Sequence, residues 1–185
     1  MTEKEIMLAG EMYNPNDPEL VNDRLQARRL LYAYNHSHPD DQEKRRRILA
    51  DLFRSEEKCY IEPAFQCDYG YNICFGENFY ANFNCVILDV CRVTFGQNAF
   101  LGPNVQIYTA THPINPTERI SGREFGKPIT IGHNVWIGGS SVILPCVTID
   151  DNVVIGAGSV VTKNIPANVV AVGQPCQPIN MIKIP

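Results

Sequence analysis

Between residues 131 and 161 a branched aliphatic side chain recurs every six positions, a period that neither an α-helix nor an ordinary β-strand has. A second regular position lies four residues after each of these and is always small or β-branched, with Gly, Asp and Asn frequent in between. The first series is Ile131, Ile137, Ile143, Ile149, Ile155 and Val161, and the second is Val135, Ser141, Val147, Val153, Ser159 and Ile165. This pattern predicts a parallel β-helix of hexapeptide repeats, in which each repeat forms one short side of a coil.

The aliphatic series also predicts a continuous core. Strands that stack about 4.8 Å apart place each inward residue on the one a full coil earlier. Each buried aliphatic side chain contributes about 1.5 to 3 kcal/mol, so the ladder holds the fold without a cofactor or a metal.

The same rhythm continues upstream in a weaker form, with one shift of four extra residues around 88–91. The inward positions that we predict there are Ile61, Cys67, Ile73, Phe79, Cys85, Phe95, Leu101 and Ile107. Residues 108–130 then interrupt the ladder as one long excursion. Long loops that project from a rigid repeat are where function concentrates.

Three helices are expected before the repeats. Thr2 and Glu5 form a capping box, and Asp17 with Pro18 marks a second helix start. A third helix is predicted from about residue 40 to residue 53. The chain therefore divides into an N-terminal helical cap over 1–57, the β-helix over 58–172 with its loop at 108–130, and a C-terminal tail over 173–185. The cap covers the open end of the first coil, as repeat proteins require.

Composition excludes several classes of function. The 185 residues are 44% hydrophobic and carry a net charge of −4, which argues against a nucleic-acid partner. The basic run at residues 44–47 is interpreted as a solvated helix face. Seven cysteines without a Cys-x-x-Cys pair are expected to be reduced, and neither a signal peptide nor a membrane span is predicted. We therefore expect a cytoplasmic protein.

The excursion carries the candidate chemistry. His112, in the sequence Thr-Ala-Thr-His-Pro, lies at the root of the loop, and imidazole is suited to proton transfer near neutral pH. The alternative is a turn residue fixed by Pro113. Glu124, later in the loop, is placed to hold the ring in one tautomer, or is simply an exposed loop glutamate.

These motifs together resemble a known family. The hexapeptide ladder, the stretch at 78–84, the loop at 109–113, the run at 126–132 and Val135-Trp136-Ile137-Gly138 are similar to sugar O-acetyltransferases. The chain most resembles the maltose O-acetyltransferases, with galactoside acetyltransferases as near relatives, and the likeness includes residues 34–37 in the cap. It implies a left-handed parallel β-helix, and a homotrimer whose sites lie between subunits.

The resemblance implies a role for each matching residue. His112 matches the general base that takes the proton from the sugar hydroxyl as it attacks acetyl-CoA. Asn82 matches an asparagine beside the acetyl group and the acceptor, supplied by the neighbouring subunit; its alternative is a surface residue. Asp17 and Asp68 match acceptor-binding positions, although Asp17 is also a helix N-cap.

The resemblance also implies a set of contacts with the cofactor, acetyl-CoA, and no metal. Gly139 matches a position whose backbone N–H faces the thioester, where an oriented donor stabilises the developing oxyanion. Ala157, Thr162 and Lys163 match residues along the pantetheine and nucleotide slot. Trp136 matches an aromatic residue near the acyl end, or else is a packing residue beside the ladder.

Two departures from the family pattern affect these expectations. Val90 stands where galactoside acetyltransferases carry a third acidic acceptor-binding residue, and Asp68 replaces a serine, so a maltose or glucose acceptor is favoured. Gln177 replaces an arginine that usually contacts the phosphates of CoA. Lys163 and Lys183 are the cations left for that contact.

Three other functions fit parts of the same sequence pattern. A γ-class carbonic anhydrase has the same coil but needs three histidine ligands for its zinc, and the coil offers only His112 and His133, with His36 and His38 in the cap. A non-catalytic β-helix scaffold would not need a histidine at the root of a loop. An acetyltransferase acting on a galactoside, a xenobiotic or an oligosaccharide keeps the chemistry and changes the acceptor.

Overall fold

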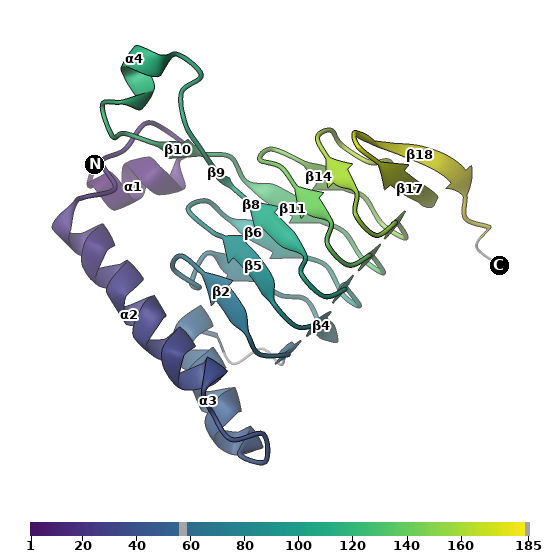
Figure 1. The fold of residues 1–185 in the computed structure, drawn as a ribbon, viewed down its shortest axis with the longest axis horizontal. Coiled ribbons are helices and arrows are strands. Elements are labelled where there is room, and N and C mark those ends of the chain that lie inside the picture. The colour runs from purple at the N-terminus through teal and green to yellow at the C-terminus, as the bar shows by residue number, and fades with distance from the viewer. Residues whose placement is uncertain (56–58, 184–185) are drawn as a thin grey trace.

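The computed structural model describes residues 1–55 and 59–183, and the chain forms a parallel β-helix with helices at its N-terminal end (Figure 1). Three sheets form the faces of a prism, and the chain passes from one face to the next at each turn. The prediction of a parallel β-helix with a helical cap and one long excursion is therefore confirmed.

The elements of the described residues fall into five groups, namely the helices, three faces and a two-stranded ribbon. The helices are α1 (Glu3–Leu8), α2 (Pro18–Asn35), α3 (Gln42–Phe53) and α4 (Pro116–Arg119). The first face contains, in spatial order, β1 (Cys59–Ile61), β4 (Phe79–Ala81), β7 (Phe100–Leu101), β12 (Trp136–Ile137), β15 (Val154–Ile155), β17 (Val169–Gly173) and β18 (Cys176–Met181). The second contains β2 (Phe65–Cys67), β5 (Cys85–Leu88), β8 (Gln106–Tyr108), β13 (Val142–Ile143) and β16 (Val160–Val161). The third contains β3 (Ile73–Cys74), β6 (Val93–Phe95), β11 (Ile129–Ile131) and β14 (Thr148–Ile149), while β9 (Ala110–Thr111) and β10 (Phe125–Gly126) form a separate ribbon.

The ladder predicted between residues 131 and 161 is confirmed. Ile131 pairs with Ile149 and Ile137 pairs with Ile155, so three six-residue repeats make one coil. Every aliphatic residue of that series is buried. Stacked apolar side chains therefore form one continuous core along the axis of the prism.

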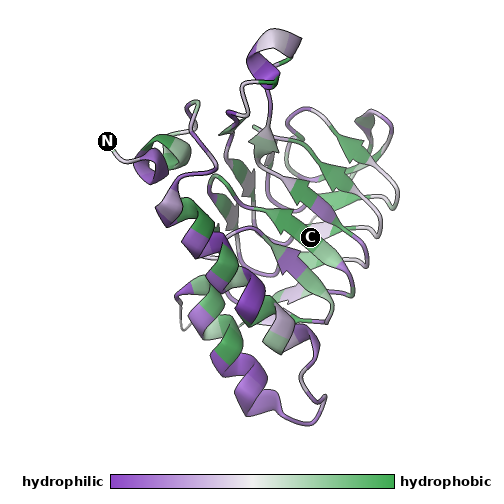
Figure 2. Cartoon of the chain, turned by 60° about the vertical axis from the view of Figure 1, so that its left-hand side comes forward, coloured by the Kyte–Doolittle hydropathy of each residue, from purple (hydrophilic) through white to green (hydrophobic). Residues whose placement is uncertain are grey.

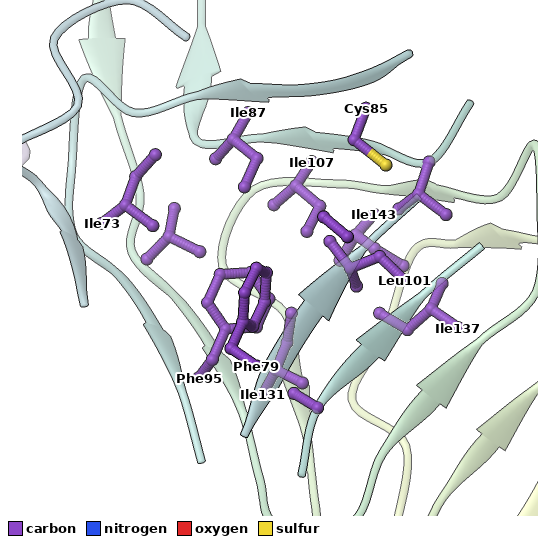
Figure 3. Packing of buried hydrophobic residues seen from close by; sticks show 14 of the residues in the cluster. Ile73, Phe79, Cys85, Ile87, Phe95, Leu101, Ile107, Ile131, Ile137 and Ile143 are labelled. Carbon is purple, nitrogen blue, oxygen red and sulfur yellow. The ribbon is translucent and has the colours of Figure 1, made fainter. Parts of the chain in front are cut away.

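Between β2 and β6 the predicted register is wrong by two residues at three positions, whereas the predicted positions before and after them, Ile61, Cys67 and Phe95, are correct. Cys67 pairs with Ile87, and Phe65 pairs with Cys85. The ladder positions there are Phe75, Ala81 and Ile87, in place of the predicted Ile73, Phe79 and Cys85. Two residues are inserted after β2 and two more after β5, instead of four at one place. Each strand buries two side chains two residues apart, so a ladder displaced by two still meets apolar side chains (Figure 3).

The turns between faces stack into three edges, which we name for later use. The glycine edge, between the first and second faces, contains residues 82–84, 102–105, 138–141 and 156–159. The excursion edge, between the second and third, contains 68–72, 89–92, 109–128, 144–147 and 162–164. The asparagine edge, between the third and first, contains 75–78, 96–99, 132–135, 150–153 and 166–168.

One asparagine in every coil holds the asparagine edge in place. Each has a left-handed backbone with φ between 56° and 61°, a conformation that asparagine tolerates better than most residues. The five are Asn78, Asn98, Asn134, Asn152 and Asn168. Their side-chain amides donate from each coil to the next over 2.8 to 3.0 Å.

The N-terminal helices begin where the sequence predicts. Thr2 forms the capping box with Glu5, and the carboxylate of Asp17 accepts the amide N–H of Glu19 at the start of α2. The third helix begins after Asp41. The predicted boundary between cap and β-helix at residues 57 and 58 lies outside the described residues. In Figure 2 the strands are mostly hydrophobic, whereas α2 and α3 mix hydrophobic and hydrophilic residues.

The cap closes the open end of the first coil. The ring of Phe53 packs edge-on against Phe65 and Phe75, with ring centroids 6.1 and 4.8 Å apart. The side-chain amide of Asn35 donates to the carbonyl of Phe65 and accepts its N–H, at 2.9 and 3.0 Å. This pairing satisfies backbone groups at the outer edge of β2.

The other end of the prism is covered by the chain itself. Strand β18 turns back antiparallel on β17, so part of the segment predicted as a tail is a strand. Cys176, at its start, is 3% exposed and joins the core. None of the helices in the described ranges is long and apolar enough to cross a membrane.

Candidate active site

The excursion leaves and returns to the prism as a two-stranded ribbon. Strand β9 pairs antiparallel with β10, with Thr111 opposite Phe125. His112 follows β9 and Glu124 precedes β10, so these two residues are the next opposed pair. The Nε2 atom of His112 lies 3.7 Å from Oε2 of Glu124. The backbone pairing thus brings the two predicted side chains of the loop together.

This pair combines an accessible imidazole with a sheltered carboxylate. The side chain of His112 is 54% exposed, and that of Glu124 is 20% exposed. A separation of 3.7 Å is too long for a hydrogen bond in this state. A carboxylate at this distance still stabilises the positive charge that the ring acquires when it accepts a proton.

A cavity of about 330 Å³ opens beside the pair, where α2, the excursion edge and the ribbon meet. This volume lies near the lower end of the range for small-molecule sites. Its lining residues are Pro15, Arg24, Arg28, Asp68, Tyr69, Leu88, Val90, Ala110, His112 and Glu124. Of the predicted acceptor-site residues, Asp68, His112 and Glu124 therefore share one cavity.

Asp68 is a partly buried carboxylate in the lining of this cavity. Burial and the carboxylate of Glu124 raise its pKa, and the guanidinium groups of Arg24 and Arg28 oppose the rise. Arg24 is itself held in place, since it donates to the hydroxyl of Tyr69 at 2.7 Å and to the carbonyl of Pro15 at 2.6 Å. The cavity thus presents both carboxylates and guanidinium donors to a ligand.

A second, fully buried carboxylate supports the turn that carries Asp68. Asp89 accepts the backbone N–H groups of Asp68, Tyr69 and Gly70 at 2.8 to 2.9 Å. Burial raises the pKa of Asp89 to about 7, and the amide donors act against that shift. The amide of Asn72 donates to the carbonyl of Asp89 at 2.7 Å. The two-residue insertions after β2 and β5 therefore pack together as one corner of the prism, which the hydrogen bonds of Asp89 hold in place.

Three of the residues expected to contact the cofactor, Asn82, Gly139 and Ala157, lie on the glycine edge. A Cβ atom on Gly102 would lie 2.6 Å from the backbone N of Gly139, and one on Gly138 would lie 2.5 Å from that of Ala157. Successive coils are thus in contact through bare backbone at these glycines. Trp136 is 55% exposed on the adjoining face.

Other predicted residues lie apart from the cavity. Asn82 is on the glycine edge, about six residues of extended chain, or roughly 20 Å, from the excursion edge. Thr162 and Lys163 are exposed on the excursion edge, in a later coil than His112. Asp17, Gln177 and Lys183 do not line the cavity; Asp17 caps α2, while Gln177 lies in β18 and Lys183 follows it.

Comparison with known proteins adds an independent finding. Residues 6–56 match a maltose acetyltransferase hexapeptide capping motif, and residues 128–163 match six repeats of the bacterial transferase hexapeptide. The galactoside O-acetyltransferase of Escherichia coli (strain K12) is 46% identical over 183 residues, or 98% of this chain and 89% of that protein. The chain belongs to the family of maltose and galactoside O-acetyltransferases.

Solved structures of this family agree with the fold throughout. The crystal structure of a maltose O-acetyltransferase from Clostridium difficile 630 is 54% identical, with a TM-score of 0.97 over 100% of this chain and 99% of that one. A galactoside acetyltransferase in complex with coenzyme A is 44% identical, with a TM-score of 0.91 over 99% of this chain and 92% of that one. The predicted resemblance is confirmed, and the chain is an acetyltransferase of this type.

Several cavity residues of this acetyltransferase were not predicted from the sequence. Arg24 and Arg28 lie four residues apart on α2 and so share a face, a spacing that was open to recognition. Two supporting residues outside the cavity lining were also not predicted: Asp89, which holds the turn that carries Asp68, and Tyr13, whose hydroxyl donates to Glu124. Within the described ranges, no group of three His, Cys, Asp or Glu residues is placed to hold a metal ion.

Proposed function

We propose that this acetyltransferase moves an acetyl group from acetyl-CoA to a hydroxyl of a glucose-type sugar, with maltose or glucose as the acceptor. The observation that carries the proposal is the His112–Glu124 pair beside a cavity that also contains Asp68. A base and a hydrogen-bonding carboxylate in one cavity match the needs of transfer to a sugar hydroxyl. The coenzyme A complex of the galactoside acetyltransferase supports the choice of donor.

In this proposal His112 is the general base. Its free ring nitrogen takes the proton of the acceptor hydroxyl while the hydroxyl oxygen attacks the thioester carbon of acetyl-CoA. The tetrahedral intermediate collapses with cleavage of the carbon–sulfur bond, and the imidazolium returns the proton to the CoA thiolate. Glu124 stabilises the transient imidazolium, and the N–H of Gly139 is assigned to the oxyanion.

The lining of the cavity supports a sugar as acceptor. Asp68 offers acceptors for hydroxyl protons, and Arg28 offers donors. Leu88, Val90 and Ala110 supply an apolar wall for the C–H face of a pyranose ring. Val90 stands where the galactoside enzymes of the resembled family carry an acidic residue, which favours a glucose-type acceptor. Asp17 joins the acceptor set in the proposal, on the strength of the resemblance alone.

The proposed path of acetyl-CoA follows two edges of the prism. Gly139 and Ala157 on the glycine edge, with Trp136 on the adjoining face, contact the acyl and pantetheine portions. The nucleotide end meets the second group of residues that the resemblance assigns: Thr162, Lys163, Gln177 and Lys183. Since Gln177 is neutral, the two lysines supply the positive charge that the CoA phosphates require.

We infer that the working enzyme is a homotrimer with each site built from two copies. Asn82 and His112 belong to opposite edges of the second face, and a small acceptor cannot span roughly 20 Å. A neighbouring copy whose glycine edge lies against the excursion edge supplies Asn82 to the cavity. This arrangement also joins the two cofactor edges into one groove.

We also infer a cytoplasmic location. Cys67, Cys85 and Cys176 are free thiols that lie buried in the core. Buried thiols that act as small hydrophobic side chains are typical of a reducing compartment.

An acceptor panel tests the proposed function. Release of the CoA thiol is measured at saturating acetyl-CoA with maltose, glucose, a β-galactoside, a chitin-type oligosaccharide and a phenolic xenobiotic. We expect the highest kcat/KM for maltose or glucose, because a mismatched sugar leaves buried polar groups unpaired. A higher value for the galactoside would contradict the reading of Val90, and reaction with only the last two would replace the acceptor class.

A further inference from the structure

The segment between α1 and α2 contacts the catalytic pair through Tyr13, while Pro15 of the same segment lines the cavity. Its side chain is fully buried, at 0% exposure, beside Met7, Leu20 and Tyr69. Its backbone pairs with the excursion in both directions. The N–H of Tyr13 donates to the carbonyl of Glu124 at 3.0 Å, and the N–H of Glu124 donates to the carbonyl of Tyr13 at 3.3 Å.

The phenol of Tyr13 also contacts the carboxylate that faces the imidazole. Its hydroxyl donates to Oε1 of Glu124, while Oε2 of the same carboxylate faces Nε2 of His112. Each oxygen of Glu124 therefore has one partner. Burial and the neighbouring carboxylate raise the pKa of Tyr13 well above its ordinary value, so the hydroxyl keeps its proton and acts as a donor.

Further contacts fix the cap segment to the ribbon. The guanidinium of Arg123, the residue before Glu124, donates to the carbonyl of Met12 at 2.9 Å and lies 3.8 Å from the carboxylate of Glu3. Helix α1 lies beside β10 (Figure 1). Because the backbone on both sides is held, loss of the Tyr13 hydroxyl would free the carboxylate without releasing the segment.

We propose that Tyr13 is a positioning residue for acetyl transfer, which fixes the carboxylate of Glu124 so that one oxygen faces His112. The helical cap then has a second task besides closing the first coil, since it supplies part of the active site. A carboxylate with both oxygens directed costs no reorganisation when the imidazolium forms. The inference rests on the proposed role of His112 as general base.

The decisive variant is Tyr13→Phe, which keeps the buried ring and removes only the hydroxyl. We expect kcat to fall about 10- to 100-fold, while KM for acetyl-CoA stays within about twofold, because the loss affects the base and not the cofactor groove. The matched control is Tyr34→Phe. Tyr34 is also a buried cap tyrosine, but its hydroxyl donates to the carbonyl of Ile61, away from the cavity. This control is expected to keep wild-type kcat.

A double-mutant cycle separates positioning from general bracing. In a Glu124→Gln background, Tyr13→Phe should lower kcat by less than about twofold, because the hydroxyl acts through that carboxylate. The inference is overturned if Tyr13→Phe folds and retains more than half of wild-type kcat, or if its effect is the same in both backgrounds. Full activity of His112→Ala would instead refute the base itself, so the two failures are distinguishable.

Discussion

The meeting of His112 and Glu124 is a consequence of backbone pairing. A ribbon that returns to its own root places the residue after β9 opposite the residue before β10. Gly126 lets the ribbon lie close to the prism, since a Cβ there would come within 2.6 Å of Val90 and Cys91. The geometry of the base therefore depends on a hairpin at the end of a rigid coil.

Removal of the imidazole tests this residue directly. His112→Ala is expected to lower kcat about 10²- to 10⁴-fold and to leave the binding of acetyl-CoA nearly unchanged, because only proton transfer is lost. Steady-state kinetics with maltose and direct titration of acetyl-CoA provide the two measurements. His133→Ala is the control, because His133 lies on the asparagine edge and accepts the N–H of Gln97. More than a third of wild-type turnover in His112→Ala would rule the base out.

The sequence predicts a site residue only where a neighbouring motif or loop boundary points to it. His112 was predicted because it stands at the root of a long loop, and Asp68 because it matches a family motif. Tyr13 and Glu124 are 111 residues apart in sequence, and nothing near Tyr13 indicates the contact. Asp89 is fully buried, and its carboxylate accepts three backbone N–H groups, an arrangement that exists only once the corner has folded.

At the scale of single elements, the coils are held by features that repeat once per turn. The aliphatic ladder fills the interior, and the asparagines tie neighbouring coils along one edge. The downstream coils were predicted correctly because one inward position in each strand is always Ile or Val. The upstream register was missed because both inward positions of those strands are apolar, so that the period alone does not distinguish them.

The asparagine edge gives a testable prediction of stability. Asn134→Ala should lower the free energy of unfolding by about 2 to 4 kcal/mol. The change removes two amide hydrogen bonds, and it places alanine, whose side chain cannot hydrogen-bond to the backbone, at positive φ. Asn134→Gly keeps the backbone conformation and should cost about 1 to 2 kcal/mol less. Urea unfolding at one protein concentration measures both. Equal losses for the two variants would show that the left-handed backbone carries no cost there.

At the scale of the whole molecule, the prism separates the two halves of the proposed site. Its second face lies between the edge that carries Asn82 and the edge that carries His112. Periodicity predicts the faces and the edges, but it does not say which edge of one copy meets which edge of another. That information came from the resemblance, and it remains a proposal that subunit mixing tests.

The most direct test of the account mixes two inactive variants. His112→Ala and Asn82→Ala subunits, each inactive alone, are combined in equal amounts, exchanged by reversible dissociation and assayed with maltose and acetyl-CoA. If each site takes one residue from each of two copies, random exchange leaves about one site in four intact over the whole mixture of trimers, so about a quarter of wild-type activity should return. If verified exchange restores no activity, each site is built within a single chain, and the proposed assembly is wrong.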